Sequence, residues 1–368
     1  MEDDSATDAI PDRPLRRGWT TGACATAATK SALNALFGGG FLDPVEITLP
    51  GGQTPAFVLA LEARETGWAE AGIVKDAGDD PDVTHGATII ARVARGASGS
   101  GVTFHAGPGI GTITRPGLSL PPGEPAINPV PRRMMREAVS EICARFGEAP
   151  DIAITLSIPN GDEIAKRTWN PRLGIVGGLS VLGTTGIVVP YSCSAWIHSI
   201  QRGVDVARAM GLSHVVGATG DRSEQAARAA LGLADEAYLD MGDFVGGLLK
   251  YLRTHRVDRV TIAGGFGKLV KLAQGAMDLH SARSTIDMAV LAKIVGELGG
   301  DDALVARCAS ANTAREVLAL CQAAGLPLAA RIATLARQNA ETIVNNSTIH
   351  VCVIVVGEAT EIVGRSEE

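Results

Sequence analysis

The chain is poor in aromatic residues: Phe, Trp and Tyr together make up 4% of its 368 residues. A core with so few large rings must be packed from Ala, Val, Leu and Ile, with close backbone approaches that the 44 glycines allow. The chain also has no basic excess, because its net charge is −7 at pH 7. We therefore expect no nucleic-acid partner, which would need a basic face. The negative net charge does not exclude an anionic small-molecule ligand, because helix N-termini and local arginines can bind one.

Paired cysteine motifs and membrane spans are also missing. The six cysteines include no CxxC and no paired spacing, which is typical of reduced thiols in a cytoplasm. The acidic segment 1–14 differs from a signal peptide and is predicted to be a disordered arm. The longest uncharged run, 173–197, is broken by glycines and Pro190, so it reads as buried strand and loop. We expect a cytoplasmic protein without a membrane partner; nothing in the sequence indicates its oligomeric state.

The order of predicted elements divides the chain into two domains of different class. In the first half, helices at 23–37 and 129–146 alternate with strands at 45–49, 57–63, 68–75, 102–105 and 152–157, with a hairpin signal at Asn160-Gly161. Segment 88–94 is expected to be a further strand, with a short helix as the alternative. In the second half, strands at 214–218, 237–239, 257–263 and 349–356 alternate with helices, the last three near 285–298, 313–324 and 327–345. We therefore expect a two-layer α+β domain over 15–192. A Rossmann-like α/β domain with a mainly parallel sheet is expected over 193–368.

A small-residue helix start, WTTGACATAATK at 19–30, is the most distinctive segment. Thr20 or Thr21 can cap this helix, and Gly22 allows another group to approach the backbone closely. The pattern predicts free N–H groups that attract an anion, with two arginines just upstream. The alternative is an ordinary capped helix that its alanines pack against a sheet.

Glycine-rich turns follow three strands of the second half. In VVGATGDRSEQ, at 215–225, a strand leads through glycines into a helix, and about twenty residues later the next strand ends in an acid. This spacing predicts a nucleotide-like site with the acid on the ribose hydroxyls, although the G-x-G-x-x-G signature is incomplete. The alternative is a set of tight turns without a ligand. The candidate cofactor-binding residues are Gly217, Gly220, Asp221, Asp240, Gly264 and Gly265.

Two further segments concentrate charge. The run KDAGDDPDVTHG at 75–86 favours either a divalent-metal loop or an acid–base pair. Its spacing misses the calcium-loop pattern, and a turn in which Asp side chains cap N–H groups is the simpler interpretation. Arg132 and Arg133 lie in the first turn of a helix, where the dipole favours acids. These arginines could bind the carboxylate of a ligand. That they simply lie on a solvated surface explains them equally well.

Five segments between about residue 15 and 275 are distinctive together: GWTTGACATAATKSAL, VKDAGDDPDVTHGATI, INPVPRRM, GGLSVLGTTGIVVP and GGFGKLVKLAQG. They resemble one family, the S-adenosylmethionine-dependent cobalt-precorrin-5B C1-methyltransferases of cobalamin biosynthesis. The family motif near GGFGKL carries a His at the position of Phe266, so we assign that side chain no catalytic role.

The resemblance implies methyl transfer from S-adenosylmethionine to C1 of a ring-contracted tetrapyrrole, which gives cobalt-precorrin-6A. Cobalt would arrive within this substrate, so no metal ligands are expected of the protein. Catalysis would consist mainly of alignment, with Asp79 or His85 managing a proton or steadying the sulfonium charge. Neighbouring pathway enzymes are further candidate partners. The anionic tetrapyrrole would bind in 15–192, at Thr20, Thr21, Gly22, Arg132, Arg133, Thr184, Thr185 and Gly186.

Within 193–368, the glycine turns would hold S-adenosylmethionine. Two alternatives remain open, a nucleotide-dependent phosphotransferase and a non-catalytic tetrapyrrole carrier. The missing Walker loop disfavours the first, and binding of S-adenosylmethionine would distinguish the enzyme from both.

Overall fold

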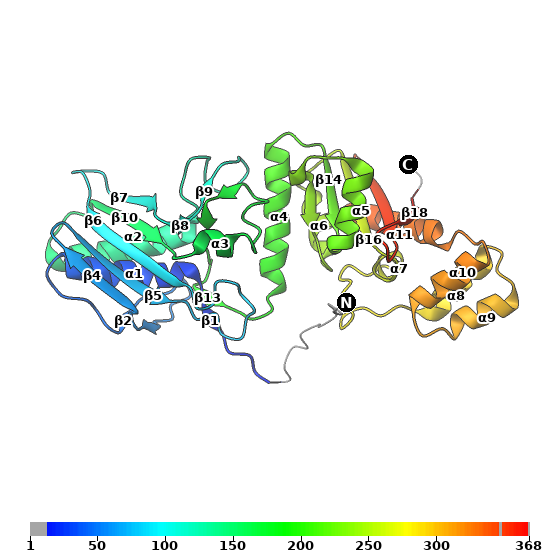
Figure 1. Ribbon diagram of the computed structural model, residues 1–368, viewed down its shortest axis with the longest axis horizontal. Helices are drawn as coiled ribbons and strands as arrows, with labels where there is room; N and C mark the ends of the chain where they lie inside the picture. Colours follow the sequence, from blue (N-terminus) through cyan, green and yellow to red (C-terminus); the bar gives the residue numbers. More distant parts are fainter. Residues whose placement is uncertain (1–12, 346–347, 367–368) are drawn as a thin grey trace. The chain divides into compact units, whose positions relative to one another are not determined.

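The structure is a computed structural model that describes residues 13–345 and 348–366 (Figure 1). The acidic arm expected at 1–14 lies almost wholly outside these residues. The chain divides between Ser192 and Cys193 into two compact units, each with its own sheet and helices. Both units mix helices with strands, as expected. Within the described residues, no helix combines the length and the apolar composition that crossing a bilayer requires.

The first unit is built on a five-stranded sheet covered by two long helices (Figure 1). Helix α1 packs on β5 and β6 and also lies against α2. Neighbouring strands are antiparallel, except that β10 and β7 are parallel. The sheet order is β4 (Leu61–Glu65), β5 (Trp68–Val74), β6 (Thr88–Arg95), β10 (Ile152–Ser157) and β7 (Val102–Ala106), and the helices are α1 (Thr21–Leu36) and α2 (Pro129–Phe146).

Alternation along the strands and small residues in α1 explain this packing. In β10, Ile152, Ile154 and Leu156 are buried, whereas the residues between them are half-buried on the other face. Fourteen of the 16 residues of α1 are buried, and six of them are alanines. Because small side chains let backbones approach closely, α1 packs against both the sheet and α2.

Short strand pairs and one short helix organise the loops of this unit. The hairpin predicted at Asn160-Gly161 is wrong: Asn160 does adopt a left-handed conformation (φ 57°), but the chain then enters a helix. The antiparallel pairs are β1 (Gly18–Trp19) with β13 (Ile187–Val188), β2 (Val45–Glu46) with β3 (Ala56–Phe57) and β9 (Thr112–Ile113) with β11 (Ile175–Val176); β8 (Gly109–Ile110) pairs parallel with β12 (Gly178–Leu179), and the helix is α3 (Gly161–Ala165).

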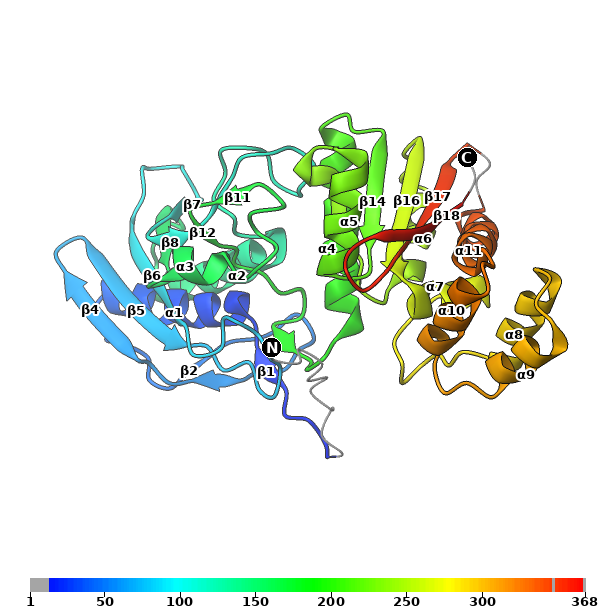
Figure 2. The ribbon, with the colours of Figure 1, turned by 45° about the vertical axis from the view of Figure 1, so that its right-hand side comes forward.

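The second unit has a five-stranded sheet whose first four strands are parallel, and a fifth that runs antiparallel (Figure 2). The mainly parallel sheet predicted for this half is therefore present. In order across the sheet, the strands are β15 (Tyr238–Asp240), β14 (His214–Ala218), β16 (Arg259–Gly265), β17 (His350–Val356) and β18 (Ile362–Arg365).

Helices cover both faces of this sheet. Alternate residues of β14 and β16 divide between two cores, one shared with α4, α6, α7 and α11 and one shared with α5. The prediction missed α9, in which only Cys308 is buried, and β18, which returns along β17. The helices are α4 (Cys193–Ala209), α5 (Asp221–Leu231), α6 (Val245–Leu252), α7 (Phe266–Ala273), α8 (Met288–Glu297), α9 (Asp302–Ala309), α10 (Ala314–Ala323) and α11 (Leu328–Val344), with a 3-10 turn at η1 (Asp235–Ala237).

The buried centre of β10 supplies a test of this packing. Truncating the fully buried Ile154 to Ala should lower the free energy of unfolding by about 2 to 5 kcal/mol, because a cavity would open in the core that the sheet shares with α1 and α2. Thr155 lies on the opposite face of the same strand and is half-buried, so Thr155→Ala should cost less than about 1 kcal/mol. Urea denaturation followed by circular dichroism compares the two variants. Equal effects would contradict the assigned faces.

Candidate functional site

The start of α1 meets two loops that are distant in sequence. We call residues 75–86 the acidic loop and residues 180–188 the threonine loop. Backbone N–H groups at 19–22 donate to carbonyls of both loops, so three of the distinctive sequence segments converge. The hydrogen bonds run from Trp19 N to Asp76 O (2.7 Å), from Thr20 N to Gly186 O (3.0 Å) and from Gly22 N to Leu182 O (3.0 Å).

The N–H groups at the start of α1 are largely taken by the protein itself. Gly22 N donates to Leu182 O, Ala23 N donates to the Thr20 hydroxyl (3.2 Å), and Cys24 N donates to Thr20 O (3.2 Å). The predicted cap by Thr20 is therefore present, but the predicted set of free N–H groups is not. These N–H groups are not free because the threonine loop packs against the helix start and its Leu182 carbonyl accepts from Gly22 N.

The threonine loop itself is partly open to solvent. Thr184 and Thr185 are exposed, whereas Gly186 is buried with a φ of 82°, a conformation that favours glycine. The Thr21 hydroxyl ties the loop to α1, since it donates to Leu182 O (3.2 Å) and accepts from Leu182 N (2.9 Å). The exposed hydroxyls of this loop therefore lie on a firmly anchored turn.

The two arginines at the start of α2 have different surroundings. Arg132 is largely buried: its guanidinium donates to Ile127 O (2.8 Å) and pairs with Glu124 (2.8 Å). Arg133 is more than half exposed and has a distant ion pair with Glu137 (3.8 Å). Arg132 thus anchors the loop that precedes α2, while Arg133 keeps its charge at the surface.

The acidic loop contains a buried ion pair. Lys75 is only 2% exposed, and its ammonium lies 2.6 Å from Asp82. Burial acts to raise the pKa of Asp82, but Lys75 and hydrogen bonds from Thr84 outweigh it and lower that pKa. A buried lysine with a carboxylate partner holds this loop in one conformation.

Asp79 and His85, the predicted acid–base residues, lie on the acidic loop and make different hydrogen bonds. Asp79 accepts a hydrogen bond from Arg16 N (2.8 Å), which is the main cause that lowers the pKa of Asp79. His85 accepts from Ala77 N (3.1 Å) through Nδ1, so a neutral ring carries its proton on Nε2. Asp79 is therefore ionised, and the His85 ring is half-exposed.

Asp80, a further carboxyl of the acidic loop, was not among the residues predicted from the sequence. Burial raises the pKa of Asp80, whose carboxylate accepts from Tyr191 N (2.8 Å). A carboxyl with a raised pKa suits proton transfer better than Asp79 does. Sequence reasoning could not have chosen it among the neighbouring aspartates, because its raised pKa comes mainly from burial, with a smaller contribution from the charge of Asp82.

The thiols and the acidic residues give no metal centre in the described parts of the chain. Cys24 is fully buried, and burial raises its pKa to about 12, so this thiol is a packing residue. All six cysteines are free. Within 13–345 and 348–366, no group of three His, Cys, Asp or Glu residues is placed to hold a metal ion.

In the second unit, two helix starts open at the carboxyl edge of the sheet. The chain passes from β14 to β15 on one side and then returns to β16 on the other side of β14. Ligands of open α/β sheets bind at such a reversal. Gly220 precedes α5 with a φ of 152°, and Gly265 precedes α7; a Cβ on either would meet no atom within 4 Å.

The other candidate glycines have packing roles. A Cβ on Gly217 would lie 2.5 Å from a methyl carbon of Leu248 and would push α6 away from the sheet. A Cβ on Gly264 would lie 3.0 Å from Thr219. Gly217 and Gly264 therefore serve the packing beneath the open edge. Asp221, by contrast, is exposed in the first turn of α5.

Lys268 joins the three turns of this edge. Its ammonium donates to Thr219 O (2.9 Å), after β14, and lies 3.1 Å from Asp243, after β15. The carbonyl of Asp240, at the end of β15, accepts from the indole of Trp196 (3.2 Å). No sequence pattern indicated a role for Lys268 or for Trp196.

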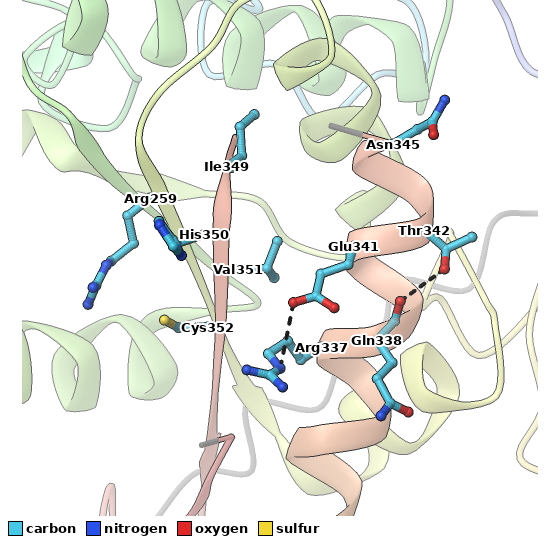
Figure 3. A pocket seen from close by; sticks show the side chains of 10 residues that line it. All are labelled: Arg259, Arg337, Gln338, Glu341, Thr342, Asn345, Ile349, His350, Val351 and Cys352. Carbon is cyan, nitrogen blue, oxygen red and sulfur yellow. Dashed lines mark hydrogen bonds and ion pairs between the residues drawn. The ribbon is translucent and has the colours of Figure 1, made fainter. Parts of the chain in front are cut away.

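A separate pocket of about 650 Å³ lies at the opposite, amino edge of the same sheet (Figure 3). It contains none of the predicted site residues. Part of its polar lining is internally paired, as Arg337 with Glu341 (3.7 Å) shows. The lining residues are Arg259, Arg337, Gln338, Glu341, Thr342, Asn345, Ile349, His350, Val351 and Cys352.

The contact between Arg16 and the acidic loop predicts an acid-sensitive component of stability. The Arg16 guanidinium, with help from Gly78 N, lowers the pKa of Asp76 from 3.8 to about 2. Because the folded-state pKa is depressed, the ionised carboxylate stabilises the fold above pH 3.8, and this contribution disappears as pH falls toward about 2. Asp76→Asn should therefore reduce the free energy of unfolding at neutral pH, with a difference from wild type that shrinks on acidification.

Urea unfolding over a pH series measures this difference. Arg16→Met removes the main cause of the lowered pKa, so it should reproduce most of the same pH dependence. A difference that stays constant down to about pH 2 would contradict the assigned ion pair.

Comparisons with known proteins identify the family. The CbiD family model matches residues 9–190, and the model of the CbiD C-terminal domain matches residues 278–367. A cobalt-precorrin-5B C(1)-methyltransferase of Paramagnetospirillum magneticum is 62% identical over 353 residues, which cover 96% of this chain and 98% of that protein. A protein of the same name from Brucella anthropi is 60% identical over 351 residues, 95% of each chain.

Among solved structures, the cobalamin biosynthesis protein CbiD of Archaeoglobus fulgidus is 26% identical. The match covers 77% of this chain and 91% of that one, with a TM-score of 0.41. Two family models and relatives near 60% identity thus account for most of the sequence. The chain belongs to the CbiD family.

Proposed function

We propose that this chain methylates C1 of cobalt-precorrin-5B with S-adenosylmethionine as methyl donor, and so forms cobalt-precorrin-6A. The observation that carries the proposal is the 62% identity to a cobalt-precorrin-5B C(1)-methyltransferase over 96% of the chain. The enzyme is a C-methyltransferase of cobalamin biosynthesis that acts on a tetrapyrrole. A cytoplasmic setting and association with neighbouring pathway enzymes belong to the same proposal.

The proposed donor site is the carboxyl edge of the second sheet, in a Rossmann-like domain over 193–368. The open helix starts at Gly220 and Gly265 offer room for a ligand, and Asp240 would accept from the ribose hydroxyls. Asp221 places a negative charge where a nucleotide would place its phosphates. This charge favours the cationic sulfonium end of S-adenosylmethionine and counts against a phosphotransferase.

The proposed tetrapyrrole site lies in the first unit, over 15–192. Its exposed polar groups are Thr184 and Thr185 on the threonine loop and Arg133 at the start of α2. An arginine and two hydroxyls can bind carboxylates at the edge of the macrocycle. Thr20, Thr21, Gly22, Arg132 and Gly186 would support this surface through the contacts described above.

The chemistry needs no protein nucleophile. S-adenosylmethionine supplies a sulfonium-bound methyl group, and the tetrapyrrole supplies an electron-rich ring carbon, so the protein contributes mainly alignment. Asp79, which stays ionised, is suited to steadying positive charge. Asp80 and His85 are suited to holding or moving a proton, because burial raises the pKa of Asp80 and the ring of His85 is half-exposed.

A direct assay tests the function. Purified protein is incubated with cobalt-precorrin-5B and S-adenosylmethionine, and the products are analysed by mass spectrometry. We expect the tetrapyrrole to gain one methyl group together with formation of S-adenosylhomocysteine. A tetrapyrrole that binds but stays unmethylated would instead support the carrier.

The ribose-binding role of Asp240 predicts a loss of cofactor affinity. Asp240→Ala should weaken binding of S-adenosylhomocysteine by at least about tenfold, or about 1.4 kcal/mol, because two hydroxyls lose their acceptor. Asp258→Ala is the matched control, since Asp258 is exposed at the other edge of the sheet. Isothermal titration calorimetry measures both. If Asp240→Ala binds as wild type does, the donor lies elsewhere.

The open space at Gly265 predicts a variant that blocks the ligand without unfolding the protein. Gly265 has an ordinary φ of −65°, and a Cβ there would meet no atom within 4 Å. Gly265→Val should therefore keep its melting temperature within a few degrees of wild type while its affinity for S-adenosylhomocysteine falls. Gly217→Val is the contrasting variant, because its side chain would collide with Leu248 and lower the melting temperature. Unchanged affinity in Gly265→Val would rule out this edge.

A further inference from the structure

A tryptophan with an exposed ring lies at the carboxyl edge of the second sheet. The chain has four Trp, and Trp196, in the first turn of α4, is the one that belongs to the second unit. Its side chain is 41% exposed, which is uncommon for so large an apolar group. Its indole N–H donates to the carbonyl of Asp240 (3.2 Å). The ring is therefore fixed beside the residue proposed to hold the ribose.

The backbone beneath the indole is shaped to receive it. Gly242 has a φ of 55°, and a Cβ there would lie 3.2 Å from Cζ2 of Trp196. Gly242 N in turn donates to Ala218 O (3.1 Å), which ties this turn to the end of β14. Phe244 supports the indole from one side, with ring centroids 6.2 Å apart and planes at 52°. The indole is thus held by contacts on one side while much of its surface stays open.

Other aromatic rings at this edge are less suited to meeting a ligand. Phe266, the first residue of α7, is only 6% exposed. Phe244 is half-buried and has Arg283 over its ring at 6.0 Å. Among the described residues of this edge, Trp196 therefore presents the largest exposed aromatic surface.

We propose that Trp196 is the platform on which the adenine ring of the methyl donor stacks. The inference rests on the proposed function, since it takes the ribose to lie at Asp240. Adenine is joined directly to that ribose, so a flat apolar surface beside Asp240 lies within its reach. Stacking of a base on an indole needs no hydrogen-bond readout and is favourable for any flat heterocycle. Trp196 would therefore bind the cofactor through its ring, while its N–H holds the turn that carries Asp240.

Tryptophan fluorescence and affinity together test this assignment in the full-length protein. S-adenosylhomocysteine should quench wild-type emission, and the quenched component should be missing from Trp196→Phe. Trp196→Leu should bind S-adenosylhomocysteine at least about tenfold more weakly than wild type, whereas Trp196→Phe, which keeps an aromatic face, should recover most of the affinity. Circular dichroism verifies that each variant is folded. Trp68→Phe, on the outer sheet face of the first unit, is the control and should leave both affinity and quenching amplitude unchanged.

The outcomes separate the inference from the function on which it rests. Normal affinity in Trp196→Leu, with wild type binding S-adenosylhomocysteine, would overturn the stacking role and leave the proposed function standing. Equal losses in the Leu and Phe variants would also overturn it, because the ring would then act only through its N–H. If Trp196→Leu fails to fold, equal quenching of wild type and of Trp196→Phe by S-adenosylhomocysteine decides against stacking. Absence of any binding by wild type would instead contradict the donor site itself.

Discussion

Close backbone contact between residues 16–19 and 76–78 is the constraint on which the first unit depends. A Cβ on Gly18 would lie 2.0 Å from the carbonyl carbon of Ala77, and one on Gly78 would lie 2.1 Å from Arg16 O. No side chain fits between these segments, so glycine is required on both. The contact fixes where α1 begins and brings the acidic loop beside it. The threonine loop then pairs with the same segment through β1 and β13.

Burial of charge and backbone groups follows from that contact. Once the acidic loop lies against α1, Lys75 is enclosed and needs Asp82 as its partner. The same enclosure gives neighbouring aspartates different properties: Arg16 N helps to keep Asp79 ionised, whereas burial raises the pKa of Asp80. A loop that is uniformly acidic in sequence therefore becomes a set of distinct carboxyl groups. Such differentiation is typical of sites where charge must be steadied and protons moved separately.

In the second unit, the order of parallel strands creates the proposed donor site. Reversal of the strand order beside β14 leaves the starts of α5 and α7 next to each other at one edge. Lys268 and the indole of Trp196 then tie together the turns that follow β14 and β15. The open positions at Gly220 and Gly265 lie within this braced edge. A rigid frame around an open space is what cofactor binding by preorganised groups requires.

The sequence by itself determined the family, the mixed α/β class and most of the elements, because these depend on local periodicity and on long segments read in order. Helix 129–146 and strands 152–157 and 214–218 were predicted with the bounds that the structure shows. Only the tertiary structure decided which groups are available. At the start of α1, Gly22 N donates to Leu182 O and is not available to a ligand. Arg132 anchors the loop before α2, and Gly217 faces the core. The tertiary structure also brought Trp196 to Asp240, because contacts between residues far apart in sequence depend on packing, which no local pattern encodes.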